Sequence, residues 1–158
     1  MRRRVMLAAA LVAVASGTGT VWAHDYRAGS VSIDHPFATP TPPGARNGAV
    51  YFRALENRGA QPDALIGATT SVSASVEIHR TTRTNDVARM READRIDLPA
   101  GARIAVRPGG DWHLMLVGLN KPLVDGERFS LRLRFERGGE QEVTVWVQRA
   151  REATGHRH

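Results

Sequence analysis

Cysteine is absent from all 158 positions of the sequence. The absence excludes disulfide bonds, thiolate metal sites, thiol catalysis and a cysteine-ligated blue-copper centre. We also expect no lipid attached through an N-terminal cysteine. A folded domain of this chain is therefore expected to be stabilised by packing alone.

Long hydrophobic runs are also scarce, because residues 5–15 form the one unbroken apolar stretch of such length. This stretch follows three arginines. Val21-Trp22-Ala23 has small residues at the two positions that a signal peptidase recognises before its cleavage site. The stretch is too short to span a bilayer. The sequence therefore predicts a signal peptide over residues 1–23 and a mature protein that is soluble in the periplasm, without stable membrane insertion.

Blocks of like charge are missing after the predicted signal peptide. That peptide holds three of the 22 lysine and arginine residues and none of the 16 acidic residues, so its removal lowers the formal net charge from +6 to about +3. The remaining arginines are interleaved with aspartate and glutamate. This pattern is typical of a solvated surface, and we expect no nucleic-acid partner.

Strand-like alternation is what the sequence does contain. Apolar and polar residues alternate over residues 129–135 and again over residues 143–147. A period of two is typical of a strand with one buried and one wet face. Gly138-Gly139 lies between the two segments and is a turn signal, so the sequence predicts a C-terminal β-hairpin.

Weaker alternation elsewhere completes an all-β pattern. We expect further strands over residues 30–34, 49–55, 73–79, 102–107 and 112–117. Four prolines over residues 36–44 predict an irregular, extended loop. Without any sustained helical period, the sequence predicts an all-β sandwich or Greek-key barrel. It is expected to be a single domain over residues 24–149, followed by a polar tail over residues 150–158.

Two methionines, Met90 and Met115, follow the predicted signal peptide. Met115 lies two residues after His113 in a predicted strand, so its thioether and the imidazole should project from the same face. Ten residues, with a turn signal at residues 84–86, separate His79 from Met90. This spacing fits a strand, a turn and a return strand that would bring His79 and Met90 close together.

Two imidazoles and two thioethers form a distinctive set of metal ligands. Thioether sulfur is soft and neutral, so Cu(I) accepts it well, whereas Zn(II), Ca(II) and Mg(II) gain little from it. Methionine also avoids the disulfide formation that threatens paired cysteines in an oxidising compartment. The residues alone leave open whether the two pairs meet, because His-x-Met also occurs by chance and methionine is common core filler.

At these residues the sequence resembles the PCuAC-like family of periplasmic chaperones, which carry Cu(I) toward the binuclear copper site of cytochrome c oxidase. The family motif is a histidine, ten residues, a methionine, about 21 residues and then His-x-Met. Here it becomes His79, ten residues, Met90, 22 residues and His113-Leu114-Met115. The flanking segments that match are residues 33–38, 41–44, 76–79, 98–101, 108–110 and 114–119.

The resemblance implies a cupredoxin-like β-sandwich with an exposed copper site near one end. It implies that one Cu(I) ion is bound by His79, Met90, His113 and Met115, without enzymatic turnover. The implied partner is a copper-receiving protein, such as cytochrome c oxidase subunit II or another periplasmic copper chaperone. We expect the protein itself to be a monomer.

The chain departs from the family pattern in two places. The second gap is one residue longer, and a surface turn at residues 109–111 can absorb the extra residue at small cost. Residues 80–82 and Val117 stand where many members carry additional methionines. We therefore predict a minimal Cu(I) site without a spare thioether, which affects handover more than binding.

Other histidines are secondary candidates. His24 would become the N-terminal residue on cleavage after residue 23, and its amine and imidazole would then chelate Cu(II). His156 and His158 offer another weak Cu(II) site, although a solvated polar tail explains them equally well. His35 precedes Pro36, and we predict a structural role for it.

Three alternative functions remain open at this stage. They are copper storage or tolerance, a copper-dependent oxidase that uses His24, and a structural or adhesive β-sandwich without metal. The sequence shows no Ser-His-Asp signature, paired-carboxylate motif or His-Glu-x-x-His motif, so we do not expect an enzyme. The lack of cysteine disfavours a copper electron carrier.

Overall fold

The computed structural model describes residues 25–149. The predicted signal peptide, His24, and the tail with His156 and His158 therefore lie outside the described residues. Within residues 25–149 no helix is long and apolar enough to cross a membrane. The described elements are all strands: β1 (Asp25–Ala28), β2 (Val31–Ala38), β3 (Asn47–Asn57), β4 (Asp63–Thr70), β5 (Ser73–Thr84), β6 (Val87–Glu92), β7 (Ile96–Leu98), β8 (Arg103–Val106), β9 (Trp112–Leu119), β10 (Arg128–Phe135) and β11 (Gly139–Val147).

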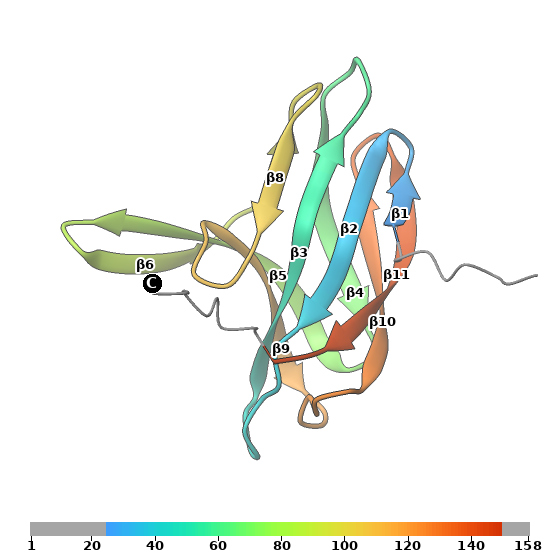
Figure 1. Cartoon of the computed structure of the whole chain (residues 1–158). Coiled ribbons are helices and arrows are strands. Elements are labelled where there is room, and N and C mark those ends of the chain that lie inside the picture. The colour runs from blue at the N-terminus through green and yellow to red at the C-terminus, as the bar shows by residue number, and fades with distance from the viewer. Residues whose placement is uncertain (1–24, 150–158) are drawn as a thin grey trace, which may run out of the picture.

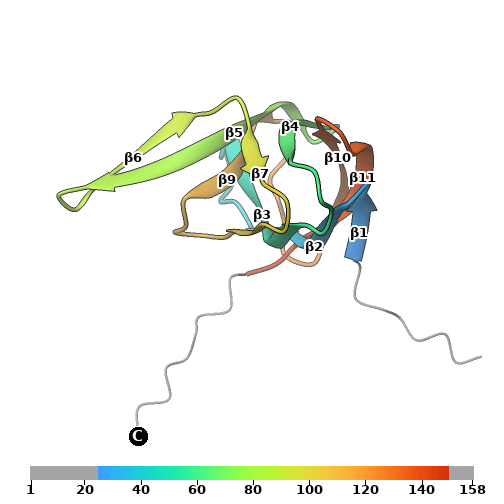
Figure 2. The same ribbon diagram turned by 90° about the horizontal axis from the view of Figure 1, so that it is seen from above.

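The strands form one continuous sheet in the order β6-β5-β9-β3-β2-β11-β10-β4-β7, with β1 added to β2 and β8 added to β3. The sheet curls, so that β4 packs near β5 although the two strands stand far apart in this order. Figures 1 and 2 show the resulting two-layered shape. The buried apolar side chains form one core cluster. The all-β prediction is confirmed.

The predicted C-terminal hairpin is confirmed as β10 and β11. Burial alternates along β10, where the aromatic and leucine side chains are buried and the intervening arginines are exposed. Phe129 lies opposite Val145 and Leu131 lies opposite Val143, so both strands place their apolar residues on the same inner face. Each such fully buried side chain contributes about 1.5–3 kcal/mol of hydrophobic stabilisation.

The expectation of a loop over residues 36–44 is wrong at its start. Residues 36–38 continue β2, and Pro36 pairs in register with Phe52 of β3. On the other side of β2, pairing with β1 ends at Asp34 and pairing with β11 begins at Phe37. Pro36 lies in the gap between these two partners, so its missing N–H breaks no ladder hydrogen bond there.

β5 and β6 continue beyond the body of the fold as a hairpin, and we call its residues 80–91 the arm. The predicted return strand is confirmed, because Thr84 pairs with Val87 across a two-residue turn. Asn85 and Asp86 both adopt positive φ, 49° and 62°, as a type I′ hairpin turn requires. Every residue of β6 is exposed, and both views show the arm projecting from the body (Figures 1 and 2).

Candidate metal centre

A pair of histidines faces outward from adjacent strands. His79 of β5 lies directly opposite His113 of β9, and their ring centroids are 5.4 Å apart. The neighbouring pair, Ile78 and Leu114, is buried and points into the core. Successive side chains of a strand point to opposite faces, so the two imidazoles stand on the outer face of the sheet. The structure therefore brings together two of the four predicted ligands.

The two methionines stand on the same face as the histidine pair. Met115 lies opposite Glu77, one step toward the body from His79, and Met90 lies opposite Thr81, one step toward the arm. Both methionines therefore lie diagonally across from His79. Met115 is on β9 and Met90 is on β6, the two strands that flank β5. Diagonal neighbours lie roughly 7–8 Å apart, and somewhat less between their Cβ atoms, which long side chains can span. The register thus groups all four predicted ligands around His79.

The four side chains differ in exposure. The side chain of His79 is 17% exposed and His113 is 8% exposed, so both rings are largely shielded. Met115 is half-buried, whereas Met90 is 61% exposed on the arm. The face therefore has a sheltered part on β5 and β9 and an open part on β6.

Hydrogen bonding and burial set the state of the imidazoles. The Nε2 atom of His79 lies 2.8 Å from a carboxylate oxygen of Glu77, while its Nδ1 atom is buried without a hydrogen-bond partner. Burial, and secondly the nearby His79 ring, lower the pKa of His113. This shift favours the neutral imidazole of His113, which is the form that binds metals.

The donor set fits a soft cation. Between residues 25 and 149, no three histidine, aspartate or glutamate side chains gather as a metal cluster. The thioethers of Met90 and Met115 are the further candidate donors on this face. The unpartnered Nδ1 of His79 is a buried acceptor that a metal ion would satisfy. Neutral imidazole and thioether donors match Cu(I) better than a hard divalent cation.

Glu77 is a further polar residue of this face, and the sequence predicts no role for it beyond its place in a segment that matches the family. The available signal was its spacing, because residues two apart on a strand share a face. Glu92, opposite His79 on β6, is a second carboxylate on this face.

His35 has the structural role that the sequence predicts. It lies in β2 with a positive φ of 47°, and its Nε2 is 3.0 Å from the side-chain amide nitrogen of Gln148. The contact joins β2 to the segment after β11. Burial, and secondly the charge of Arg53, lower the pKa of His35, and Asp34 partly offsets this.

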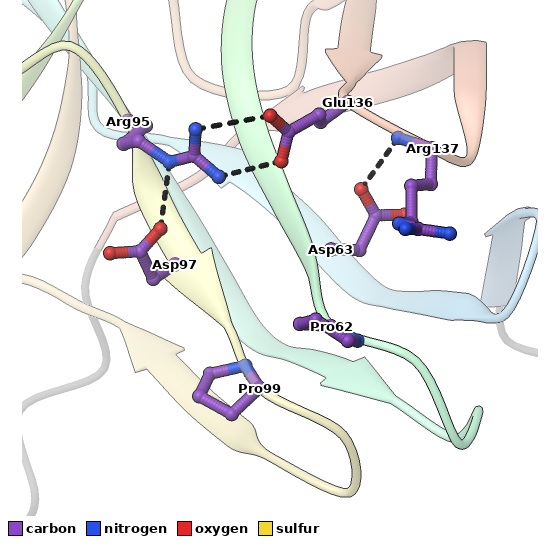
Figure 3. A pocket seen from close by; sticks show the side chains of 7 residues that line it. All are labelled: Pro62, Asp63, Arg95, Asp97, Pro99, Glu136 and Arg137. Atoms are coloured by element: carbon purple, nitrogen blue, oxygen red, sulfur yellow. Dashed lines mark hydrogen bonds and ion pairs between the residues drawn. The ribbon is translucent and has the colours of Figure 1, made fainter.

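A separate hollow lies away from this face. It has a volume of about 650 Å³ and, as Figure 3 shows, it is crossed by the guanidinium of Arg95. Arg95 makes two hydrogen bonds to Glu136 and one to Asp97, so these charges satisfy one another. The lining residues are Pro62, Asp63, Arg95, Asp97, Pro99, Glu136 and Arg137, and none of the predicted ligands is among them.

Comparisons with known proteins agree with this architecture. The family model described as "LpqE-like: Putative lipoprotein LpqE-like" matches residues 31–147. A putative lipoprotein of Leifsonia xyli subsp. xyli is 37% identical over 98 residues, which are 61% of this chain and 58% of that protein. The chain therefore spans less than two thirds of the length of this curated relative.

Solved structures extend the likeness to the fold. The copper-bound PCuAC domain from PmoF2 matches with a TM-score of 0.69 and 28% identity, over 80% of this chain and 99% of that domain. The Cu(I) form of DR1885 from Deinococcus radiodurans matches with a TM-score of 0.60 and 31% identity, over 76% of this chain and 80% of that one. The predicted cupredoxin-like β-fold is confirmed.

Proposed function

The chain belongs to the LpqE-like family of putative lipoproteins, and on that premise we propose that it is an exported copper chaperone that carries one Cu(I) ion on His79, Met90, His113 and Met115. The observation that carries the proposal is the cross-strand histidine pair, with both methionines in diagonal register on the same outer face. Copper is the cargo of this protein. No step of a reaction is assigned to these residues.

The similar solved structures support the identity of the cargo. One is described as copper-bound and another as a Cu(I) form, and both exceed 25% identity with this chain. The neutral donor set supports the reduced state, because soft thioethers stabilise Cu(I) more than Cu(II). The ligands also leave the ion with a net positive charge, which favours its release to a partner with anionic ligands.

The exposure of Met90 supports delivery to a partner. An acceptor's ligand would replace the most exposed of the four donors first, while the sheltered imidazoles still hold the ion. The acceptor that we propose is the copper site of cytochrome c oxidase subunit II, or another periplasmic copper chaperone. We further propose that the protein works as a monomer in the periplasm, on a domain over residues 24–149 that follows a cleaved signal peptide over residues 1–23.

Replacing the two methionines tests this proposal. The double variant Met90→Leu/Met115→Leu keeps the volume and apolar character of both side chains but removes both sulfur atoms. We expect Cu(I) affinity to fall by at least about tenfold, equivalent to about 1.4 kcal/mol, in an anaerobic competition with a chromogenic chelator. Val87→Ala is the matched control, because Val87 is an exposed apolar residue of the same hairpin that lies outside the ligand set.

Unchanged affinity in the double variant would remove the methionines from the site. The alternative of an oxidase using His24 makes the opposite prediction. Adding one residue before His24 would then abolish copper binding and copper-dependent oxidation, while the methionine variants would behave like the parent. Copper storage or tolerance would use the same site. A transfer experiment separates delivery from storage: the loaded protein is mixed with an acceptor domain, and copper in the acceptor is measured by its absorption.

A further inference from the structure

His79 presents its two ring nitrogens to different surroundings. Nε2 lies 2.8 Å from the carboxylate of Glu77, a hydrogen-bonding distance. Nδ1 is buried and has no hydrogen-bond partner. The two residues are neighbours on the outer face of β5, because side chains two apart on a strand point the same way. One nitrogen of this ring is thus held by a hydrogen-bond partner, and the other is buried without one.

The Glu77 contact determines which nitrogen carries the hydrogen. An ionised carboxylate only accepts hydrogen bonds, so the Nε2 atom facing it must be the N–H donor. In the neutral ring, Nδ1 is then the atom with the free lone pair. A buried acceptor without a donor is unfavourable, and bound metal would provide the missing partner.

We infer that Glu77 is a positioning residue of the proposed centre, which fixes His79 in the tautomer that binds copper through Nδ1. The inference rests on the proposed function. Metal-bound histidines generally donate their second N–H to a carboxylate or carbonyl, which fixes the ring orientation and makes the ligating nitrogen more basic. Glu77 is half-buried, with its side chain 33% exposed, and it lies opposite Met115. Its carboxylate therefore orients His79 from within the sheltered part of the face.

Glu92 provides a matched control for this role. It lies directly opposite His79, on the same face and with the same charge as Glu77. It is exposed on β6, and the hydrogen bond of the His79 ring is donated to Glu77. Any effect of negative charge near the centre would be shared by both glutamates, whereas the effect of the hydrogen bond belongs to Glu77 alone.

The test combines a tautomer measurement with copper binding in the mature chain. Two-bond ¹H–¹⁵N NMR spectra of the metal-free protein at neutral pH should show His79 protonated at Nε2 and unprotonated at Nδ1. On addition of Cu(I), the Nδ1 resonance should change most. In Glu77→Ala the tautomers should mix, and Cu(I) affinity should fall by about 10- to 100-fold. Glu77→Gln keeps an acceptor oxygen and should restore most of both properties.

Three results would overturn the inference. They are a shift at Nε2 instead of Nδ1 on Cu(I) loading, an unchanged tautomer in Glu77→Ala, or an equal loss of affinity in Glu92→Gln. We expect Glu92→Gln to bind Cu(I) within about twofold of the parent, since exposed charges contribute little. Binding through Nε2 would refute this inference but leave the proposed function standing. A parent protein that binds no Cu(I) at His79 would refute both.

Discussion

At the scale of single residues, the two methionines should not contribute equally. Met115 is half-buried among its neighbours on β9, whereas Met90 is 61% exposed on the arm. A free methionine side chain loses up to about 1.5–2 kcal/mol of conformational entropy when it is fixed, and Met90 has more of this freedom to lose on binding an ion. Met115 is therefore the better prepared of the two proposed ligands.

We predict that Met115→Leu weakens Cu(I) binding about tenfold more than Met90→Leu does, a difference of about 1.4 kcal/mol. The two single variants are compared in the same anaerobic chelator competition. Each variant loses one thioether through the same Met→Leu change. The difference between their Cu(I) affinities therefore reports how far each methionine is already fixed before the ion binds. Equal losses, or a larger loss for Met90→Leu, would contradict the argument from exposure.

Acid should destabilise the metal-free protein through two histidines. Burial is the main cause that lowers the pKa of both His113 and His35 below the ordinary value of 6.5. The unfolded chain therefore binds more protons than the folded chain between the two pKa values, so stability rises with pH through this window. The contribution is complete above about pH 6.5 and is lost as the pH falls toward the folded-state pKa values.

Urea unfolding at a series of pH values checks this sign. We expect the free energy of unfolding to fall as the pH is lowered from about 7 to about 5. His35→Asn should reduce this pH dependence, because asparagine does not titrate and tolerates the positive φ of this position. A stability that rises toward acid pH, or a slope that His35→Asn leaves unaltered, would show that the histidines are not responsible.

The sequence predicts some residue relations in this site and not others. His113 and Met115 share a face because the period of any strand is two, and this can be derived locally. The contact of His79 with His113 depends on the register of β5 against β9, which only the folded sheet fixes. The spacing of Glu77 and His79 predicts that they share a face, but the hydrogen bond between them depends on the side-chain conformation, which the sequence does not encode locally.

At the scale of elements, the turn of the arm determines where Met90 lies relative to the other proposed ligands. The positive φ values of Asn85 and Asp86 set the hairpin turn, and the turn sets the register that places Met90 opposite Thr81. Shifting the register by one residue would move Met90 to the other face. The turn should therefore affect copper binding without touching the ion.

We predict that Asn85→Val lowers Cu(I) affinity, whereas Asp86→Gly does not. A β-branched residue at positive φ costs about 1–2 kcal/mol, while glycine adopts this conformation freely. The arm is exposed, so we expect the unfolding midpoint of the whole protein to change little in either variant. Chelator competition and cross-strand NMR contacts between Thr81 and Met90 measure the effect. If Asn85→Val lost the β5–β6 register but still bound Cu(I) with the affinity of the parent, Met90 would not be a ligand.

Other elements show where local pattern fails. β10 and β11 were predicted because their alternation is strict. β4, β7 and β1 were not predicted, because β7 has three residues, β1 has four, and β4 contains Gly67 and is buried on successive residues at its start. Their pairing with longer strands, a tertiary effect, makes them strands.

At the scale of the whole molecule, the curled sheet places the apolar core on its inner side and the proposed ligands on its outer side. The inner faces of the strands form one apolar core that includes Ile78, Leu114 and Leu116. The outer faces of the same strands carry the proposed ligands. A copper ion at the proposed centre would therefore be gained and lost on the outside without repacking the core, as the proposed carrier role requires.

The class of the fold was predictable from the sequence, but the strand order was not. Repeated period-two segments indicate an all-β protein wherever they occur. The parallel pairing of β2 with β11 joins strands from opposite ends of the chain, through Phe37 and Trp146. No local pattern encodes this pairing, and it was the family resemblance that implied the complete architecture.

X-ray absorption at the copper edge tests the central claim most directly. The mature protein is loaded anaerobically with one equivalent of Cu(I), and sulfur and nitrogen scatterers are then distinguished. We predict two sulfur and two nitrogen ligands, and the loss of both sulfur contributions in Met90→Leu/Met115→Leu. A spectrum of the parent without any sulfur scatterer would contradict the proposed centre.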